Sequence, residues 1–341
     1  MGRKRWQIGA ALALLIPVSC ALVTAGASLT TPAKAPAPVP SVSAAPTPFP
    51  LLSPAPQPTP EVKEKLEISP ELLFLRKQIR EVFGSDLPPE LAELLAEVVP
   101  GADPELAAEL RRAATDAHLK ELFSEGEAAV VLAEANTGEW LYSLNPDRPM
   151  VAASTYKLFV MTDILWHVQD GSLPWASYIG NQSVSDCLSS MVVESDNECS
   201  EEWLYLMGYD HLDQVAQQMS ATETSFQPGN LITTAADLSQ LLTQLWQGRL
   251  LDEKHTQYAL DLMAEQIFRE GIPAGLGPDV WVADKVGWLD GVYNDAAIFR
   301  LPEGDEGVMV ILTEGLSPTV TARAAAIMYQ WTYTGRDDNH N

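Results

Sequence analysis

A serine and a lysine stand three residues apart at the start of an apolar segment, in VAASTYKLFVM at 151–161. If this segment is a helix, Ser154 and Lys157 lie on the same side of its first turn. A serine hydroxyl is a poor nucleophile until a base removes its proton, and a lysine can be that base when burial and nearby positive charge lower its pKa. The first turn of a helix also points backbone N–H groups at a developing oxyanion. Alone, however, the pair is better explained as a capped helix start with a surface lysine.

Two other short runs contain polar residues that could complete such a site. Ser-Asp-Asn occupies 195–197 within ESDNE, between two predicted helices. Lys-Val-Gly occupies 285–287 on a predicted strand. Whether these runs meet Ser154 depends on the elements that carry them.

The predicted strands fall into two groups, one on each side of a helical block. Alternating patterns at 128–135 and 139–145, split by Asn-Thr-Gly, predict a β-hairpin ahead of Ser154. Three more strands follow far downstream, at 280–288, 291–301 and 307–315. Helices are predicted roughly at 154–169, 183–193, 197–207, 209–219, 234–247 and 252–265, with a last one at 319–333. This order predicts an α+β fold in which both ends of the chain complete one five-stranded antiparallel sheet and the middle forms a helical subdomain.

The three runs together resemble a known motif set. Ser-x-x-Lys, then Ser-Asp-Asn, then Lys-Thr-Gly is the set of the serine β-lactamases and penicillin-binding proteins. From about residue 104 to 335 the chain resembles class A β-lactamases and the related penicillin-recognising serine hydrolases along its whole length. The resemblance implies the β-lactamase/transpeptidase-like fold and a serine hydrolase that acts on cyclic amides.

The resemblance also implies a role for each matching residue. Ser154 would be the acylated nucleophile, and Lys157 its base or proton relay. Ser195 would pass a proton toward the leaving nitrogen, and Asn197 would hold a substrate amide. Asp196 would brace the loop rather than touch substrate.

The third motif would contribute the substrate-binding side of the site. Lys285 would attract the substrate carboxylate and help to keep Lys157 deprotonated. The oxyanion hole would consist of the backbone N–H groups of Ser154 and Trp288, and Gly287 completes this substrate-binding set.

Two departures from the family pattern bear on the chemistry. Val286 replaces the Thr or Ser of the third motif, so one hydroxyl that would bond the substrate carboxylate is missing. Class A enzymes also deacylate with the Glu of a Glu-x-x-Leu-Asn loop. If Asn230 matches the Asn of that loop, Phe226 takes the position of the Glu, and the resemblance places Glu223 at a turn outside the site. We therefore expect acylation with poor turnover.

The cysteines are spaced so that a disulfide is possible, whereas the histidines do not indicate a metal site. Cys187 and Cys199 flank the Ser-Asp-Asn run and could form a disulfide in an oxidising compartment, the alternative being two free buried cysteines. No metal or other cofactor is expected, because the histidines are scattered without a paired ligand spacing. They are His118, His167, His211, His255 and His340.

The N-terminal part predicts export. Three basic residues at 3–5 precede an uncharged apolar run at 8–29, which is typical of a signal peptide or a membrane anchor. The chain is then predicted to continue through a linker rich in Pro and Ala and a short helical neck into the hydrolase domain. The expected boundaries are 1–29 for the signal or anchor, 30–65 for the linker, 66–101 for the neck and 102–336 for the domain.

The composition and net charge limit the classes of molecule that the protein is expected to bind. The 341 residues carry a formal net charge of −25, which argues against nucleic acid because phosphate binding needs Lys and Arg. The expected protein is an extracytoplasmic monomer whose partner is a β-lactam or a peptidoglycan stem peptide. Two alternatives stay open: a penicillin-binding or D,D-peptidase-like protein, and a cell-wall-binding module without catalysis.

Overall fold

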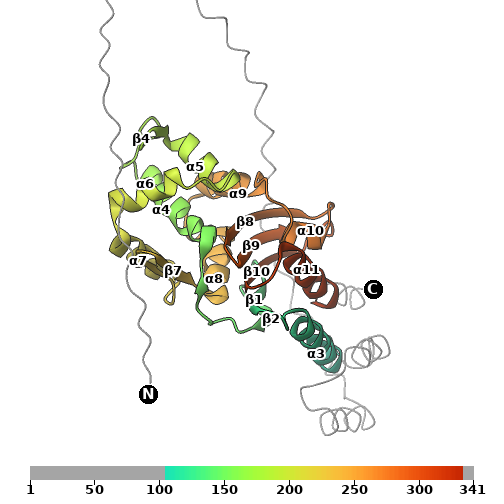
Figure 1. Cartoon of the computed structure of the whole chain (residues 1–341). Helices are drawn as coiled ribbons and strands as arrows, with labels where there is room; N and C mark the ends of the chain where they lie inside the picture. Colours follow the sequence, from blue (N-terminus) through green and yellow to red (C-terminus); the bar gives the residue numbers. More distant parts are fainter. Residues whose placement is uncertain (1–103, 333–341) are drawn as a thin grey trace, which may run out of the picture. The chain divides into compact units, whose positions relative to one another are not determined.

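The computed structural model describes residues 104–332 (Figure 1). The predicted signal or anchor, the linker and the neck lie outside these residues. The predicted helix that starts the domain is α3, Pro104–Leu122. Within the described part of the chain, no helix combines the length and the apolar character needed to cross a bilayer.

A five-stranded antiparallel sheet forms the centre of the domain (Figure 1). Its order is β2-β1-β10-β9-β8, so β1 pairs with β10 and the two ends of the domain meet in the middle of the sheet. The bounds are β1 Glu127–Glu134, β2 Trp140–Leu144, β8 Trp281–Leu289, β9 Val292–Arg300 and β10 Glu306–Glu314. This confirms the predicted sheet and its two groups of strands.

Helices cover both faces of the sheet because its strands bury side chains in both directions. Along β1, Val130 and Leu132 face one apolar core while Ala129 and Val131 face the other. The first core packs under α3, α10 (Ile272–Leu276) and α11 (Pro318–Thr332). The second packs under the helical block (Figure 1). That block comprises α4 Lys157–Gln169, α5 Val184–Val193, α6 Glu198–Met207, α7 Tyr209–Gln218, α8 Ala235–Trp246 and α9 Glu253–Ala264.

Several short elements were not predicted from the sequence. A small sheet joins β3 (Met150–Val151), β7 (Asn230–Thr233) and β6 (Ser225–Gln227), and a further pair joins β4 (Tyr178–Ile179) to β5 (Gln182–Ser183). Strands of two to four residues are too short to show an alternating pattern. The small sheet matters for the site, because β3 leads directly into the segment that carries Ser154.

Candidate active site

Ser154 lies in a short 3-10 turn, Ala153–Tyr156, which runs into α4 at Lys157. The predicted helix therefore begins with a tighter turn than expected. Ala153 has φ +44°, in the left-handed region that costs a non-glycine residue about 1–3 kcal/mol. The Thr155 hydroxyl and its backbone N–H both donate to the Ala152 carbonyl, at 2.6 and 3.2 Å. These bonds fix the strained turn that presents the serine.

A buried asparagine holds this turn against the central sheet. Asn294 on β9 donates from Nδ2 to the carbonyls of Val151 and Ala152, at 2.8 and 3.1 Å. Its Oδ1 accepts the backbone N–H of Thr313 on β10 at 3.1 Å. Because the side chain is fully buried and all three contacts are made, Asn294 locates the nucleophile segment relative to two strands. Sequence reasoning missed it, although two adjacent polar residues, Asn294 and Asp295, interrupt the apolar pattern of this strand.

Gly287 lets the third motif approach the nucleophile. A Cβ at this position would lie 2.7 Å from the Ser154 nitrogen and 2.8 Å from the Thr155 nitrogen. Those distances are too short for any side chain, so the backbone of β8 and the backbone of the serine turn pack directly against each other. The glycine is thus required by close approach rather than by an unusual φ angle.

Lys157 connects the first motif to the second. Its side chain is fully buried, and Nζ donates to the Ser195 carbonyl and to Asn197 Oδ1, both at 2.7 Å. A neutral amine has two N–H groups and one lone pair. The two hydrogen bonds therefore use both N–H groups of the neutral form and leave the lone pair to accept a proton.

Lys285 connects the third motif to the second. It is also fully buried, and Nζ donates to Ser195 Oγ and to the Val286 carbonyl, both at 2.8 Å. Ser195 thus accepts a hydrogen bond from Lys285 at its hydroxyl and one from Lys157 at its backbone carbonyl. Its φ of +59° places it, like Ala153, in the left-handed region. The structure therefore brings Lys157, Ser195, Asn197 and Lys285 into one network beside the turn that carries Ser154.

Both lysines have lowered pKa values. Burial lowers the pKa of Lys157 to about 8, although the Asp196 and Glu201 carboxylates act to raise it. Burial also lowers the pKa of Lys285 to about 7, with a further contribution from repulsion by Lys157. Neutral Lys157 is therefore accessible near neutral pH, as a general base requires.

Trp288 follows Gly287 at the outer end of β8. Its side chain is 45% exposed, and its ring meets that of Phe268 edge-on with centroids 4.5 Å apart. The pair forms an aromatic rim next to the motif network. Sequence reasoning used only the backbone of Trp288 and did not identify Phe268.

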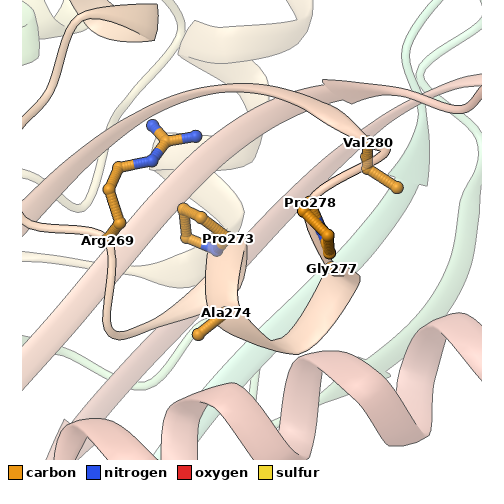
Figure 2. A pocket seen from close by; sticks show the side chains of 6 residues that line it. All are labelled: Arg269, Pro273, Ala274, Gly277, Pro278 and Val280. Carbon is orange, nitrogen blue, oxygen red and sulfur yellow. The ribbon is translucent and has the colours of Figure 1, made fainter.

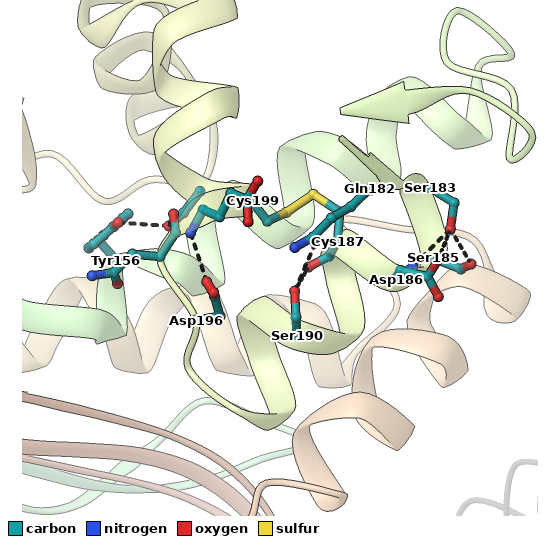
Figure 3. The surroundings of a disulfide bond; sticks show 12 residues. Tyr156, Gln182, Ser183, Ser185, Asp186, Cys187, Ser190, Asp196 and Cys199 are labelled. Atoms are coloured by element: carbon teal, nitrogen blue, oxygen red, sulfur yellow. Dashed lines mark hydrogen bonds between the residues drawn. A yellow bond between two sulfur atoms is a disulfide. The ribbon is translucent and has the colours of Figure 1, made fainter. Parts of the chain in front are cut away.

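A disulfide joins Cys187 on α5 to Cys199 on α6, with Cα atoms 5.0 Å apart (Figure 3). Of the two alternatives that the sequence left open, the structure contains the bonded one. The loop between the cysteines carries Ser195 and Asn197, and the Asp196 N–H donates to the Ser190 carbonyl at 3.0 Å. Closing a loop of this length stabilises a fold by roughly 3 kcal/mol in the chain-entropy model.

An apolar ring stands where the family resemblance places the deacylating glutamate. Phe226 on β6 is 1% exposed and contacts Tyr156 and Phe159 edge-on, with centroids 6.3 and 5.8 Å apart. The neighbouring strand β7 is tied to the serine segment, because the Ala152 N–H donates to the Leu231 carbonyl at 2.9 Å. Glu223 lies in an exposed turn, as the resemblance implies. The hairpin therefore packs beside the nucleophile and presents no carboxylate at Phe226.

A second charged layer lies behind β8. Asp284 and Asp295 are fully buried, and burial, together with the neighbouring Asp295 carboxylate, raises the pKa of Asp284 well above its usual range. Arg269 bonds Asp284 and the Val282 carbonyl from this side. It also borders a pocket beneath α10 (Figure 2). The residues that line this pocket are Arg269, Pro273, Ala274, Gly277, Pro278 and Val280, and none of them belongs to the three motifs.

The fold and the order of the motifs agree with the family of β-lactamases and penicillin-recognising serine hydrolases, as the resemblance predicted. Residues 111–332, more than half of the chain, match the model of the Beta-lactamase enzyme family, and the chain belongs to this family. No curated protein matches the chain in sequence.

Solved structures give the same fold at low identity. A β-lactamase from Sphaerobacter thermophilus DSM 20745 has a TM-score of 0.58 and 19% identity, over 64% of this chain and 94% of that one. PBP-A has a TM-score of 0.58 and 21% identity, over 63% and 94%. A mutant of the class A β-lactamase of the last common ancestor of Gram-negative bacteria has a TM-score of 0.60 and 18% identity, over 67% and 100%. At these identities the likeness shows the fold alone.

Proposed function

We propose that the chain is an exported serine hydrolase that is acylated at Ser154 by β-lactams or D-Ala-type amides and releases the acyl group slowly. One observation carries the acylation half of this proposal. The lysines of the first and third motifs both bond Ser195 of the second, next to a strained turn that presents Ser154. Such a network can move a proton from the nucleophile to a leaving nitrogen.

Acylation would use the network as follows. Neutral Lys157 accepts the proton of Ser154 as its Oγ attacks the carbonyl carbon, and the oxyanion is held by the backbone N–H groups of Ser154 and Trp288. As the C–N bond breaks, Ser195 gives its hydroxyl proton to the nitrogen. The hydrogen bond from the Lys285 ammonium stabilises the Ser195 oxygen and can return a proton to it. An ester on Ser154 and a protonated amine result.

The substrate is expected to carry an anionic group. Lys285 supplies the positive charge, but Val286 supplies no hydroxyl and is itself fully buried. One missing hydrogen bond to a charged group weakens binding by roughly 1–3 kcal/mol. The proposed protein therefore binds carboxylate-bearing substrates more weakly than one with Thr at 286 would.

Slow deacylation is supported by the hairpin that holds Phe226. An aromatic ring packed on Tyr156 and Phe159 cannot take a proton from water. Because this position holds no carboxylate to activate water, water should attack the ester slowly and the acyl-enzyme should persist. One structural neighbour, a mutant of PBP-A, is described as an acyl-enzyme complex with penicillin G, which makes this antibiotic a reasonable first probe.

Intact mass spectrometry tests the proposal directly. We expect full-length protein mixed with penicillin G to gain the whole mass of the antibiotic, because the nitrogen of an opened ring stays attached. The adduct should map to Ser154, last for hours and be absent in Ser154→Ala. The exposed serine after α4 gives the matched control, Ser172→Ala, which should be acylated normally.

Two other outcomes would change the assignment. A brief adduct with continuing loss of antibiotic would mean that another group activates water, and the protein would be a turning-over β-lactamase. Folded protein that gives no adduct at millimolar antibiotic would contradict acylation and favour a binding module without catalysis.

Export belongs to the same proposal. It is supported by the basic residues at 3–5, the apolar run at 8–29 and the disulfide, a bond that persists in oxidising compartments. Fractionation of cells with an antibody to the domain would test it. Finding the protein in the cytoplasm, with its N-terminus intact and its cysteines reduced, would contradict it.

A further inference from the structure

A buried carboxylate in the helical block has only histidines for charge partners. Asp163 on α4 has a side chain that is 1% exposed, and within residues 104–332 its ion-pair partners are His167 and His211, with no lysine or arginine among them. The two imidazoles are 28% and 31% exposed and therefore reach toward solvent. A buried carboxylate needs a positive partner, which here is an imidazolium or a metal ion.

The donor atoms are spaced as metal ligands are. One ligand atom from each residue can be chosen so that all three lie within 4.8 Å of one another. His211 Nε2 lies 2.9 Å from Asp163 Oδ2, and His167 Nδ1 lies 3.6 Å from Asp163 Oδ1. Two ligands at about 2.0–2.1 Å from a tetrahedral zinc stand about 3.3 Å apart. These two separations lie on either side of that value but join the imidazoles to different carboxylate oxygens, and His167 Nδ1 also lies 2.9 Å from the Asp163 backbone carbonyl, so the side chains must rotate before they bind one ion.

The surroundings supply a partner that orients the carboxylate. Trp203 on α6 donates from Nε1 to Asp163 Oδ2 at 2.7 Å, which fixes the carboxylate between the two imidazoles. The Trp203 ring also meets that of His167 edge-on, with centroids 5.4 Å apart. Ligating carboxylates and histidines in metal sites are typically held by such outer contacts.

We propose that Asp163, His167 and His211 bind a divalent transition-metal ion, with zinc as the expected ion and water in the fourth position. Two imidazoles and one carboxylate suit zinc, and three protein ligands leave one position open. Each imidazole must offer a lone pair, so His211 Nε2 and His167 Nδ1, which now contact oxygens of Asp163, carry no proton when the ion is bound. No catalytic step is assigned to this ion.

A bound ion would link helices that begin at or next to motif residues. Asp163 lies on α4, which begins at Lys157, and Trp203 lies on α6, which begins just after Asn197. His211 adds α7. At about 1.5 Å per residue, Asp163 stands roughly 9 Å along α4 from Lys157. A bound ion would thus fix α4, α6 and α7 to one another behind the proposed active site without touching substrate.

Calorimetry with zinc alone tests the proposal on untagged full-length protein after EDTA treatment and dialysis. Every sample carries Cys20→Ser, because a thiol at position 20 would compete for the ion. We expect one zinc per chain, and cobalt in its place should give the visible absorption of a tetrahedral N/O site. His211→Ala should weaken zinc binding by more than about a hundredfold, and Trp203→Phe by roughly tenfold to a hundredfold. His255→Gln is the matched control, since His255 lies on α9, where it contacts Asp252 and Trp175, and its loss should leave binding unchanged.

Stability measurements separate a metal site from a hydrogen-bond cluster. Zinc should raise the melting temperature of the parent protein and of His255→Gln, but not of His211→Ala, each compared with its own value in EDTA. Folded parent protein that binds no zinc would overturn the proposal, and so would zinc binding that His211→Ala leaves unchanged. Acylation at Ser154 is scored separately, so either proposal can fail without the other.

Discussion

The two sides of the serine turn differ in what they can do to a proton. On one side, Lys157, Ser195 and Lys285 form a polar network that reaches all three motifs. On the other, the hairpin β6–β7 packs Phe226 against Tyr156 and Phe159. The two lysines of the first side and the Phe226 ring of the second are all buried, so the difference lies in the chemistry of the side chains. Under the proposed function, the polar side would form the acyl-enzyme, while the other side carries an aromatic ring where the family resemblance places the deacylating glutamate.

The largest expected effect is on the polar side. Lys157→Ala should slow acylation by penicillin by about 10²–10⁴-fold, because a positioned general base contributes about that factor. Stopped-flow or quenched mass spectrometry gives the rate. Lys120→Ala, at an exposed lysine on α3, should acylate at the parent rate. If Lys157→Ala stayed within tenfold of the parent, the polar network would not be the acylating machinery.

The next prediction concerns the apolar side. Phe226→Glu should lower the free energy of unfolding by at least about 3–5 kcal/mol, the usual cost of truncating a buried Phe, because it also buries an unpaired carboxylate. We expect no gain in turnover. Urea unfolding and antibiotic consumption measure the two effects, and Phe226→Leu gives an apolar control. Fast turnover in a stable Phe226→Glu protein would show that the hairpin lacks only a base.

The disulfide stabilises the loop that contributes Ser195 to the polar side. The double variant Cys187→Ser, Cys199→Ser should be destabilised by roughly 3 kcal/mol, because the loop that carries Ser195 and Asn197 is no longer closed. Chemical unfolding of the variant and of reduced parent protein should agree. Equal stability of the oxidised and reduced parent would contradict this expectation.

The two lysines should affect different quantities as the pH changes: Lys157 the rate of acylation, and Lys285 the binding of substrate. A lowered pKa favours the neutral amine, so the limiting acylation rate should rise about tenfold per pH unit and level off above about 8. An ordinary lysine would keep the rate rising toward pH 10.

Binding of carboxylate-bearing β-lactams should weaken above about pH 7 as Lys285 loses its proton. A β-lactam ester without the carboxylate is the control, and its binding should not follow pH in this way.

The smallest effect concerns a carboxylate near Lys157. Glu201 acts to raise the pKa of Lys157 against the larger effect of burial, so Glu201→Gln should move the rising limb of the acylation profile to lower pH. Glu125→Gln, at an exposed position before β1, should leave the profile in place. A shift to higher pH in Glu201→Gln would contradict the expectation that the Glu201 carboxylate raises the pKa of Lys157.

The sequence predicted most of this fold because its long elements carry clear periodicity. The five strands and the helices of the central block lie within a few residues of their predicted bounds. The motif set could also be predicted, because each motif is a run of three or four consecutive residues. The pairing of Cys187 with Cys199 was an open alternative, because two cysteines a dozen residues apart meet only if α5 and α6 pack together.

What the sequence did not predict depends on packing between distant segments. The small sheet of β3, β6 and β7 has strands too short for a pattern. The role of Asn294 could not be predicted, because its partners Val151 and Ala152 lie more than a hundred residues earlier in the chain. His167 and His211 were expected to be scattered, yet their rings stand 6.0 Å apart, because α4 and α7 cross beside Asp163.

The pairing of β1 with β10 also has a consequence for how the chain is made. Glu127 pairs with Glu314, so a hairpin that leaves the ribosome early waits for a partner almost at the end of the domain. Until then the inner edge of β1 is open, and pairing over such a separation is intrinsically slow. Synthesis that stops before residue 306 should therefore give a product without its central strand, which the cell's proteases would remove. The central sheet, by contrast with any local hairpin, cannot close until this late strand is available.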